Sequence, residues 1–237
     1  MKKYIYILLS SLVIFSCSDS NYIQVNLNKN WSFKASDSTS WNQATVPGVV
    51  HLDLLNLNQI EDPFYGDNEK KLQWIDKKKW EYKTTIIADK SLLEKDKIEL
   101  HFKGLDTYAS ITLNNKNILN SDNMFREFTV DCKDLLKEGN NELYVLFKSP
   151  AKEGEKLFNQ SDYFIKAQPN DDSILGGLED KTVSPYTRKA GYHYGWDWGP
   201  RFFTSGVWRP IYLNAWSEAV IRDVFVQQTE LTNEKAE

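Results

Sequence analysis

The stretch Lys97-Ile98-Glu99-Leu100-His101-Phe102 decides the fold class of this chain. Polar and apolar residues alternate along it with a period of two, so an extended segment would have one apolar and one polar face. Antiparallel sheets with one buried face and one solvated face have this pattern. The sequence therefore predicts a β-strand here that covers a hydrophobic core from one side.

Strand patterns recur on both sides of this stretch. The segments share aromatic and β-branched residues or period-two alternation, and they are residues 80–87, 109–113, 117–119, 126–130 and 141–147. Asn114-Asn115 is a favoured hairpin turn, and Gly139 is expected to supply a positive φ before a strand. Residues 53–57 are expected to form one or two helical turns. No stretch of ten or more residues outside the N-terminus has sustained helical periodicity, which predicts an all-β sandwich.

The second half of the chain contains a long segment without a strand pattern. Residues 151–185 are rich in glycine and polar residues and are expected to form a loop. Strand patterns return at residues 206–213, and residues 219–226 are expected to begin another domain. The predicted organisation is a sandwich over residues 27–216, followed at 217–237 by the truncated start of a second β-sandwich domain.

Composition excludes several function classes. A chain of 237 residues that is 41% hydrophobic can bury a real core, and a net charge of -4 provides no basic surface for a phosphate backbone, so nucleic acid is not an expected partner. The spacings of the three histidines and two cysteines match no metal-binding motif. The sequence therefore predicts neither a metal site nor a cofactor.

The first 17 residues have the layout of an export signal. Two lysines precede an apolar run over residues 4–15, which is too short to span a bilayer, and Ser16 directly precedes Cys17. This arrangement resembles the bacterial lipobox. It predicts a lipid anchor on Cys17, a tether over residues 18–26 and an exported lipoprotein, periplasmic or at the cell surface. The alternative is an ordinary secretory signal in which Cys17 has no role. A lipidated Cys17 cannot pair with Cys132, so no disulfide is expected and Cys132 is interpreted as structural.

The densest candidate site is Gly191-Tyr192-His193-Tyr194-Gly195-Trp196-Asp197-Trp198-Gly199-Pro200-Arg201. Sugar rings pack their C–H faces on aromatic rings, and two vicinal hydroxyls can donate hydrogen bonds to one carboxylate. If the Trp196-Asp197-Trp198 triplet is a turn, which its flanking glycines favour, all three side chains can line one rim. The alternative is that both indoles belong to the sandwich core and that Asp197 pairs with Arg201 or Arg188.

Four blocks of the sequence, in the same order, resemble the N-terminal domain of family 2 β-mannosidases. They are residues 46–55 (VPGVVHLDLL), residues 62–82 from DPFYGDNE through LQW to WEY, the GWDWGPR motif at residues 195–201, and GVWRPI at residues 206–211. The resemblance runs from about residue 30 to residue 216.

The resemblance implies a jelly-roll, galactose-binding-like sandwich, followed by an immunoglobulin-like domain and a (β/α)8 barrel with two catalytic glutamates. It also implies that Asp197, flanked by Trp196 and Trp198, recognises the non-reducing mannosyl unit of a β-mannoside glycan. Because the catalytic glutamates belong to the barrel, this chain is expected to contain no catalytic residue and to be inactive alone. Arg188 and Lys189 are weaker candidates for orienting Asp197 or contacting the barrel. The aromatic residues of the turn-rich block at residues 62–66 are expected to pack on the sandwich or at the barrel interface, and Glu69, Gln73 and Trp74 are candidates for lining the same interface. His51 and His193 are interpreted as structural.

Two other function classes remain open on sequence grounds. The chain could be a free-standing carbohydrate-binding module or surface lectin, because a jelly-roll with exposed aromatic residues serves either role. It could also be a structural adhesion or assembly domain in which the two tryptophans belong to the core. Replacing Asp197 distinguishes this last class from the others. In a structural domain the replacement would change stability and leave sugar recognition unaffected.

Overall fold

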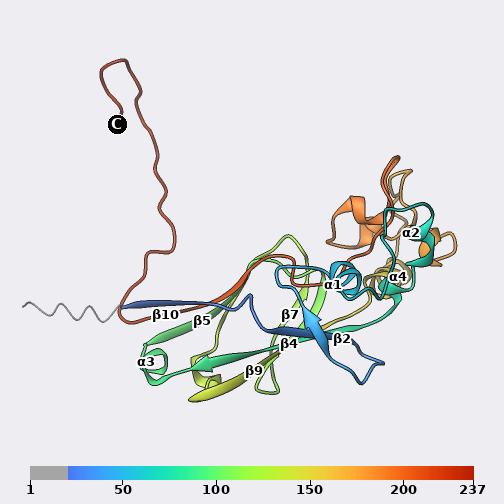
Figure 1. Cartoon of the computed structure of the whole chain (residues 1–237). Helices are drawn as coiled ribbons and strands as arrows, with labels where there is room; N and C mark the ends of the chain where they lie inside the picture. Colours follow the sequence, from blue (N-terminus) through green and yellow to red (C-terminus); the bar gives the residue numbers. More distant parts are fainter. Residues whose placement is uncertain (1–20) are drawn as a thin grey trace, which may run out of the picture.

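The structure, a computed structural model, describes residues 21–237, so the predicted signal, Cys17 and the first tether residues lie outside the described residues. Within that range the chain forms two antiparallel sheets (Figure 1). One sheet has the strand order β1-β10-β5-β8 and the other the order β3-β2-β4-β9-β6-β7. The strands are β1 (Tyr22–Asn26), β2 (Trp31–Ala35), β3 (Asn42–Ala44), β4 (Trp80–Ala88), β5 (Lys97–Phe102), β6 (Tyr108–Leu113), β7 (Lys116–Asp122), β8 (Phe128–Asp131), β9 (Gly139–Phe147) and β10 (Ile211–Trp216).

The hydrophobic core lies between the two sheets, as the period-two pattern predicted. Ile98, Leu100 and Phe102 of β5 are fully buried in it, while Lys97 on the same strand is exposed. From the other sheet, β4 and β9 contribute alternate residues such as Tyr82 and Val145 to the same cluster. The predicted all-β sandwich is therefore confirmed.

The predicted turns are also present. Asn114 and Asn115 have φ values of 51° and 65° and connect β6 to β7 in a tight hairpin, as required by turns in which both central residues have positive φ. Gly139 has a φ of 87° where β9 begins. Cys132 is buried, and burial raises the pKa of its thiol to about 12, which fits a structural role.

Short helices lie at both ends of the sandwich (Figure 1). They are α1 (Val50–Asn56), α2 (Asn68–Lys71), α3 (Lys90–Leu93) and α4 (Pro150–Gln160), with 3₁₀ turns η1 (Ile75–Lys77), η2 (Lys133–Leu135), η3 (Ser173–Gly176), η4 (Ser184–Tyr186) and η5 (Gly191–Tyr194). Helices α2 and α4 lie at one end and α3 at the other. Helix α1 confirms the expected one or two turns. Its Asp53 accepts hydrogen bonds from the Thr45 amide (2.7 Å) and the Tyr82 hydroxyl (2.8 Å), and burial raises the Asp53 pKa to about 6.

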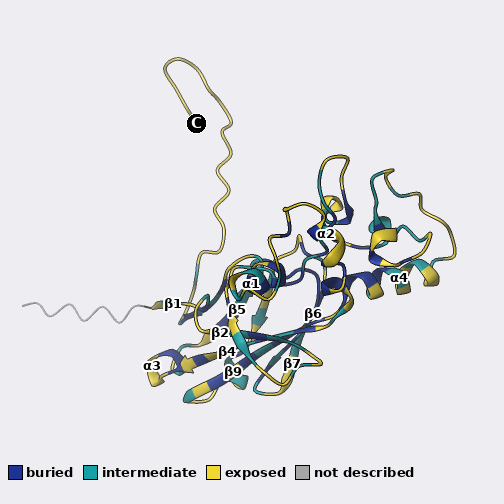
Figure 2. Ribbon diagram, turned by 45° about the vertical axis from the view of Figure 1, so that its right-hand side comes forward, coloured by how far each residue is buried: buried dark blue, intermediate teal, exposed yellow. Residues whose placement is uncertain are grey.

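The prediction of a loop over residues 151–185 is wrong at its start, because α4 begins there. Ser149 caps the helix, its hydroxyl accepting from the Lys152 amide at 3.1 Å, and Pro150 takes the first helical position, where a missing N–H costs nothing. Ala151 and Gly154 face inward, and Phe158 packs against a second small cluster that includes Val183 and Tyr194. This satellite cluster packs α4 against later parts of the long segment, and Figure 2 shows both buried and exposed residues on α4.

Two predicted boundaries differ from the structure. Residues 22–26, assigned to the tether, form β1, whose register pairs Tyr22 with Trp216 of β10. The sandwich therefore begins before residue 27. Residues 219–226, predicted to be a strand, form none: Val224, Phe225 and Val226 are exposed, and within residues 21–237 this segment pairs with no strand. The alternation is present, but a strand needs a neighbour to bond its backbone groups. Residues 21–237 contain no helix that is both long and apolar enough to cross a membrane.

Candidate functional site

The predicted Trp196-Asp197-Trp198 site is a tight turn at the surface. Trp196 and Gly199 exchange two backbone hydrogen bonds of 3.1 and 3.2 Å, which puts Asp197 and Trp198 at the tip. Trp196 is 45% exposed and Trp198 is 83% exposed, and their rings meet edge to face at 6.0 Å. The turn prediction is therefore confirmed. The alternative that these indoles form the sandwich core is wrong.

Gly195 permits the chain to enter this turn. Its φ is 112°, a conformation that side chains disfavour, and a Cβ atom there would lie 2.6 Å from the Asp172 carboxylate and 3.0 Å from the Asn170 carbonyl. Asp172 also donates its backbone amide to the Tyr194 carbonyl at 2.7 Å. The start of the turn is thus fixed by close packing against residues 170–172.

Arg201 fixes the other end of the turn. Its guanidinium is fully buried, lies 2.7 Å from the Asp76 carboxylate and stacks on the Phe203 ring at 3.9 Å. Gln73 accepts from the guanidinium and donates to the Arg201 carbonyl at 3.0 Å, while Glu69 accepts from the Arg201 amide. Glu69 and Gln73 thus hold the backbone that carries the turn, and their place at an interface with a barrel stays a prediction.

The Asp197 carboxylate is exposed and, among residues 21–237, takes part in no hydrogen bond or ion pair. The predicted alternative of a pair with Arg201 is wrong, because Arg201 is committed to Asp76. Arg188 is exposed and forms no ion pair with Asp197, while Lys189 is buried and forms an ion pair with Asp106. Asp197 therefore presents a free carboxylate to solvent between two exposed aromatic rings.

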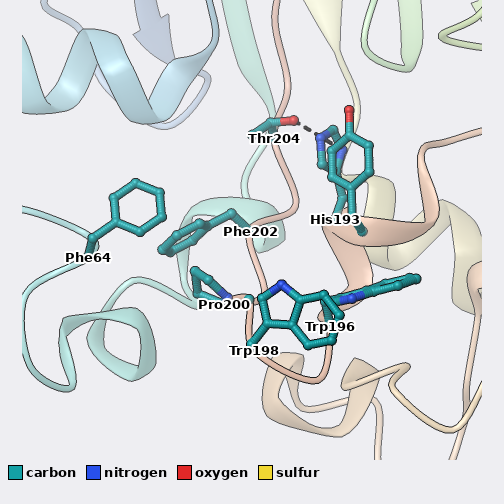
Figure 3. Close-up of a pocket in the computed structure, with 9 residues that line it drawn as sticks. Phe64, His193, Trp196, Trp198, Pro200, Phe202 and Thr204 are labelled. Carbon is teal, nitrogen blue, oxygen red and sulfur yellow. Dashed lines mark hydrogen bonds between the residues drawn. The ribbon is translucent and has the colours of Figure 1, made fainter.

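Two adjoining hollows include residues of the turn. The first, of about 550 Å³, is almost entirely aromatic and apolar (Figure 3). Its lining consists of Phe64, Tyr192, His193, Trp196, Trp198, Gly199, Pro200, Phe202 and Thr204. The second, of about 500 Å³, shares both indoles but adds the carboxylates of Glu69, Asp172 and Asp197. The turn thus offers apolar contact in the first hollow and hydrogen-bond acceptors in the second.

Phe64 and Phe202 close one side of the first hollow. Their rings meet edge to face at 5.4 Å, and Phe64 is 76% exposed (Figure 3). Phe64 and its neighbour Tyr65 belong to the turn-rich block that was expected to pack on the sandwich or on a barrel. Both are largely exposed here, and Phe64 meets the sandwich through its edge-to-face contact with Phe202.

A buried polar network lies behind the first hollow. The Lys189 ammonium donates to the Asp106 carboxylate and to the Thr204 carbonyl at 2.7 Å, and the Thr204 hydroxyl lies 3.3 Å from Nδ1 of His193. Burial would raise the Asp106 pKa, but Lys189 and its other partners hold that pKa below the ordinary value. Burial, with the charge of Lys189, lowers the pKa of His193 to about 3.

His51 is neutral for the same reason. Burial lowers its pKa to about 4, and its ring packs 5.5 Å from that of Phe202. Both histidines therefore line or support an apolar surface as uncharged rings, and their interpretation as structural stays a prediction. Trp74 does not reach the site and packs 6.2 Å from Trp80.

Backbone contacts bring together the sequence blocks that flank the site. The Gly48 amide donates to the Val207 carbonyl at 2.8 Å, and the Val50 amide donates to the Ser205 carbonyl at 2.9 Å. A Cβ atom on Gly206 would lie 2.5 Å from the Gly48 carbonyl oxygen. The block at residues 46–55 and the block at residues 206–211 therefore form one packed unit.

Sequence reasoning missed Phe202, Asp76 and Asp106. Asp106 and Lys189 are 83 positions apart, so no local pattern marks them as partners. Phe202 directly follows the GWDWGPR motif, and its position there was the available signal. Residues 21–237 contain no group of three histidine, cysteine or acidic side chains placed to hold a metal ion.

Comparison with known proteins agrees with this architecture. Beta-mannosidase B of Thermothelomyces thermophilus is 37% identical over 209 residues, which are 86% of this chain and 23% of that protein. Beta-mannosidase B of Emericella nidulans is 36% identical over 216 residues, 87% of this chain and 24% of that protein. The chain thus spans about a quarter of the length of the curated relatives it matches.

Solved structures show the same likeness. The beta-D-mannosidase of Dictyoglomus thermophilum superposes with a TM-score of 0.82 at 39% identity, covering 90% of this chain and 25% of that one. A beta-D-glucuronidase of Dictyoglomus thermophilum, at 15% identity and a TM-score of 0.56, shares the fold. The family model described as glycosyl hydrolase 2 galactose-binding domain-like matches residues 31–209. From this match over most of its length, the chain belongs to the galactose-binding-domain-like family of glycosyl hydrolase 2 proteins.

Proposed function

We propose that this chain is the N-terminal, substrate-recognising part of an enzyme that removes terminal β-D-mannose residues from the non-reducing ends of β-mannosides. The names of its relatives support the activity, since both matched sequences and the structure with a TM-score of 0.82 are β-mannosidases. The exposed turn at Trp196, Asp197 and Trp198 supports the role of this part in recognition.

One observation carries the proposal: the Asp197 carboxylate is exposed and unpaired within residues 21–237, between two exposed indoles. A carboxylate in this state can accept hydrogen bonds from two neighbouring hydroxyls of one sugar ring. The indole faces can pack on the C–H face of the same ring. The rigid support of the turn by Arg201 reduces the ordering that binding would require.

The hydrolytic step is assigned to the part of the enzyme that this chain does not span. Retaining glycosidases use two carboxyl groups about 5 Å apart, one as nucleophile and one as acid and base. We place these groups in a (β/α)8 barrel, as the resemblance implies, and propose that the 237-residue polypeptide alone does not turn over mannosides. The exposed aromatic surface at Phe64 and Tyr65 is proposed as the contact with that barrel.

We also propose that the protein is exported and held on a membrane through a lipid on Cys17. Support comes from the sequence alone: a basic start, an apolar run and a serine directly before the cysteine. An anchored enzyme would meet its glycan in the periplasm or at the cell surface.

The test uses the full-length gene product on an aryl β-mannoside. Asp197→Asn removes the charge with little change in shape, and Asp134→Asn, at another exposed aspartate, is the matched control. We expect kcat/KM to fall roughly 10- to 150-fold in the first variant, because hydrogen bonds to charged groups contribute about 1.5–3 kcal/mol. The control should retain full activity. An unchanged kcat/KM in Asp197→Asn would reject the recognition role of Asp197, and a full-length product without activity on the mannoside would favour a free-standing binding module or lectin.

A further inference from the structure

The outer face of the four-stranded sheet carries a second group of polar and aromatic side chains. Strand register places Gln24, Asn214 and Glu99 side by side across β1, β10 and β5. The same register places Tyr212 beside His101 in the next row. These residues alternate with the buried core residues of their strands, so they point away from the core.

This face is hollowed. A depression of about 430 Å³ is bounded on one side by residues 220–222, which follow β10. Its lining consists of Tyr22, Gln24, Glu99, His101, Lys103, Glu127, Thr129, Tyr212, Asn214, Trp216 and residues 220–222. In Figures 1 and 2, β1 lies on the opposite side of the molecule from α2 and α4, so this hollow is separate from the Trp196-Asp197-Trp198 turn.

The hollow presents planar hydrogen-bonding groups. The Gln24 amide donates to the Asn214 side-chain oxygen at 2.9 Å, and this contact leaves the Asn214 NH₂ group without a partner among the described residues. Glu99 is nine-tenths buried and accepts two hydrogen bonds from Arg222, of 2.7 and 3.0 Å. Amide, carboxylate and guanidinium groups together match the donor and acceptor pattern of neighbouring sugar hydroxyls.

Charge in the hollow is balanced. Arg222 pairs with Glu99, and Lys103 pairs with Glu127. His101 adds little charge, because burial lowers its pKa despite the nearby Glu99. With each cation neutralised by a carboxylate, the hollow favours neither an anion nor a cation. An uncharged, hydroxyl-rich ligand fits this environment better than a phosphate or a metal ion.

The hollow also contains aromatic side chains. The rings of Tyr212 and His101 are stacked at 4.9 Å with an interplanar angle of 15°, while Trp216 is buried beside the Arg222 guanidinium, which lies 5.2 Å from its ring. Tyr22 is 40% exposed at the rim. Rigid rings beside polar groups are the combination that binds the two kinds of surface on a pyranose.

We propose that this outer face is a second carbohydrate-binding site, which takes one or two units of a neutral hexose oligosaccharide. It is independent of the turn at Asp197 and of any hydrolytic activity. Its role would be to hold the enzyme on its polysaccharide, while the turn recognises the chain end. The inference goes beyond the proposed function, and the experiment below separates the two.

Isothermal titration calorimetry of the 237-residue chain with β-1,4-mannotriose and cellotriose tests the proposal. The titration is made on an Asp197→Ala background, in which the recognition turn lacks its carboxylate. We expect saturable binding of at least one trisaccharide in the millimolar range or tighter. Adding Asn214→Ala should weaken that binding about tenfold or more, which is about 1.4 kcal/mol of binding free energy.

One control variant and one substitute variant accompany Asn214→Ala. Asn120→Ala, at an exposed asparagine of the other sheet, should leave binding unchanged. If Asn214→Ala fails to fold, Gln24→Ala on the edge strand β1 replaces it. No binding of either trisaccharide overturns the proposal, and so does binding that survives both Asn214→Ala and Gln24→Ala. Binding seen in the wild type but lost in Asp197→Ala also overturns it and assigns the sugar to the turn alone.

Discussion

The guanidinium of Arg201 lies 2.7 Å from the carboxylate of Asp76, and both side chains are almost completely shielded from solvent. Arg201 follows the exposed Trp196-Asp197-Trp198 turn, while Asp76 lies in η1, just before the core strand β4. A buried ion pair therefore joins the recognition turn to the sandwich. Desolvation opposes ionisation of Asp76, and burial raises its pKa despite the attraction of Arg201.

Removing one partner of this pair should destabilise the fold strongly. We expect Arg201→Met to lower the free energy of unfolding by about 3–5 kcal/mol, because it leaves an uncompensated buried carboxylate. Urea unfolding followed by tryptophan fluorescence measures the change. Lys71→Met is the control, since the Lys71–Glu61 pair is exposed and its loss should cost under about 1 kcal/mol. Equal losses in the two variants would contradict the anchoring role of Arg201.

Acid should destabilise the protein through His51 and His193. Their pKa values in the folded state are lowered to about 4 and about 3, from an ordinary value near 6.5. Between pH 6.5 and about 4 the unfolded chain therefore binds protons that the folded chain does not, so stability falls as pH falls. Asp53, whose pKa is raised to about 6, and Asp76, whose pKa burial also raises, act in the opposite sense, so the histidine contribution is isolated by substitution.

The variant His193→Gln isolates one of these contributions. Each such histidine adds a slope of up to about 1.4 kcal/mol per pH unit to the free energy of unfolding. Unfolding curves from pH 7 to pH 4.5 should give a clearly shallower slope for the variant than for the wild type. Parallel slopes would show that His193 accepts a proton in the folded protein.

Gly195 should not tolerate a side chain. Gly195→Ala places a Cβ atom 2.6 Å from the Asp172 carboxylate at a φ of 112°, so we expect a loss of about 1–3 kcal/mol in stability. Gly191→Ala is the matched control, because a Cβ atom at Gly191 has no neighbour within 4 Å. Differential scanning calorimetry compares the two melting temperatures. A melting temperature for Gly195→Ala equal to that of the control would show that a Cβ atom at residue 195 causes no strain.

The proposed lipid anchor has a direct test. Growth of the native host with an alkyne-tagged palmitate should label the wild-type protein and leave Cys17→Ser unlabelled. Cys132→Ser serves as the control, since Cys132 is buried and should not affect labelling. Equal labelling of the Cys17→Ser variant would exclude Cys17 as the attachment site, and absence of label on the wild type would favour an ordinary secretory signal.

Much of the sandwich is readable from local patterns. Alternation over residues 97–102 and 80–87 predicted the central strands β5 and β4, because their two faces meet different environments. The same reasoning failed at α4, where the helical signal lies in the cap at Ser149 and Pro150 and not in a long apolar stripe. It also failed at residues 219–226, since alternation reports amphipathicity and not the presence of a neighbouring strand.

The sequence predicted the exposed residues of the turn but not the residues that hold the turn in place. Trp196, Asp197 and Trp198 are consecutive, and their glycine neighbours marked a turn. The groups that hold the turn come from elsewhere: Gln73 is 128 positions from Arg201. Such pairings depend on how the sheets stack, and no local spacing encodes them. The role of the triplet in binding sugar stays a prediction that the Asp197 variants address.

The pairing of Tyr22 with Trp216 would determine the orientation of a lipid-anchored molecule relative to the membrane. Cys17 precedes Tyr22 by five positions, a span of at most about 18 Å for an extended chain. A lipid at Cys17 would keep the β1 edge close to the bilayer, and β10 ends at that edge as well, so whatever follows also departs near the lipid surface. The tryptophan turn, beside α2 and α4 at the far side of the molecule, would then face outward (Figure 1). Anchoring would thus present the recognition end to glycans arriving from solution.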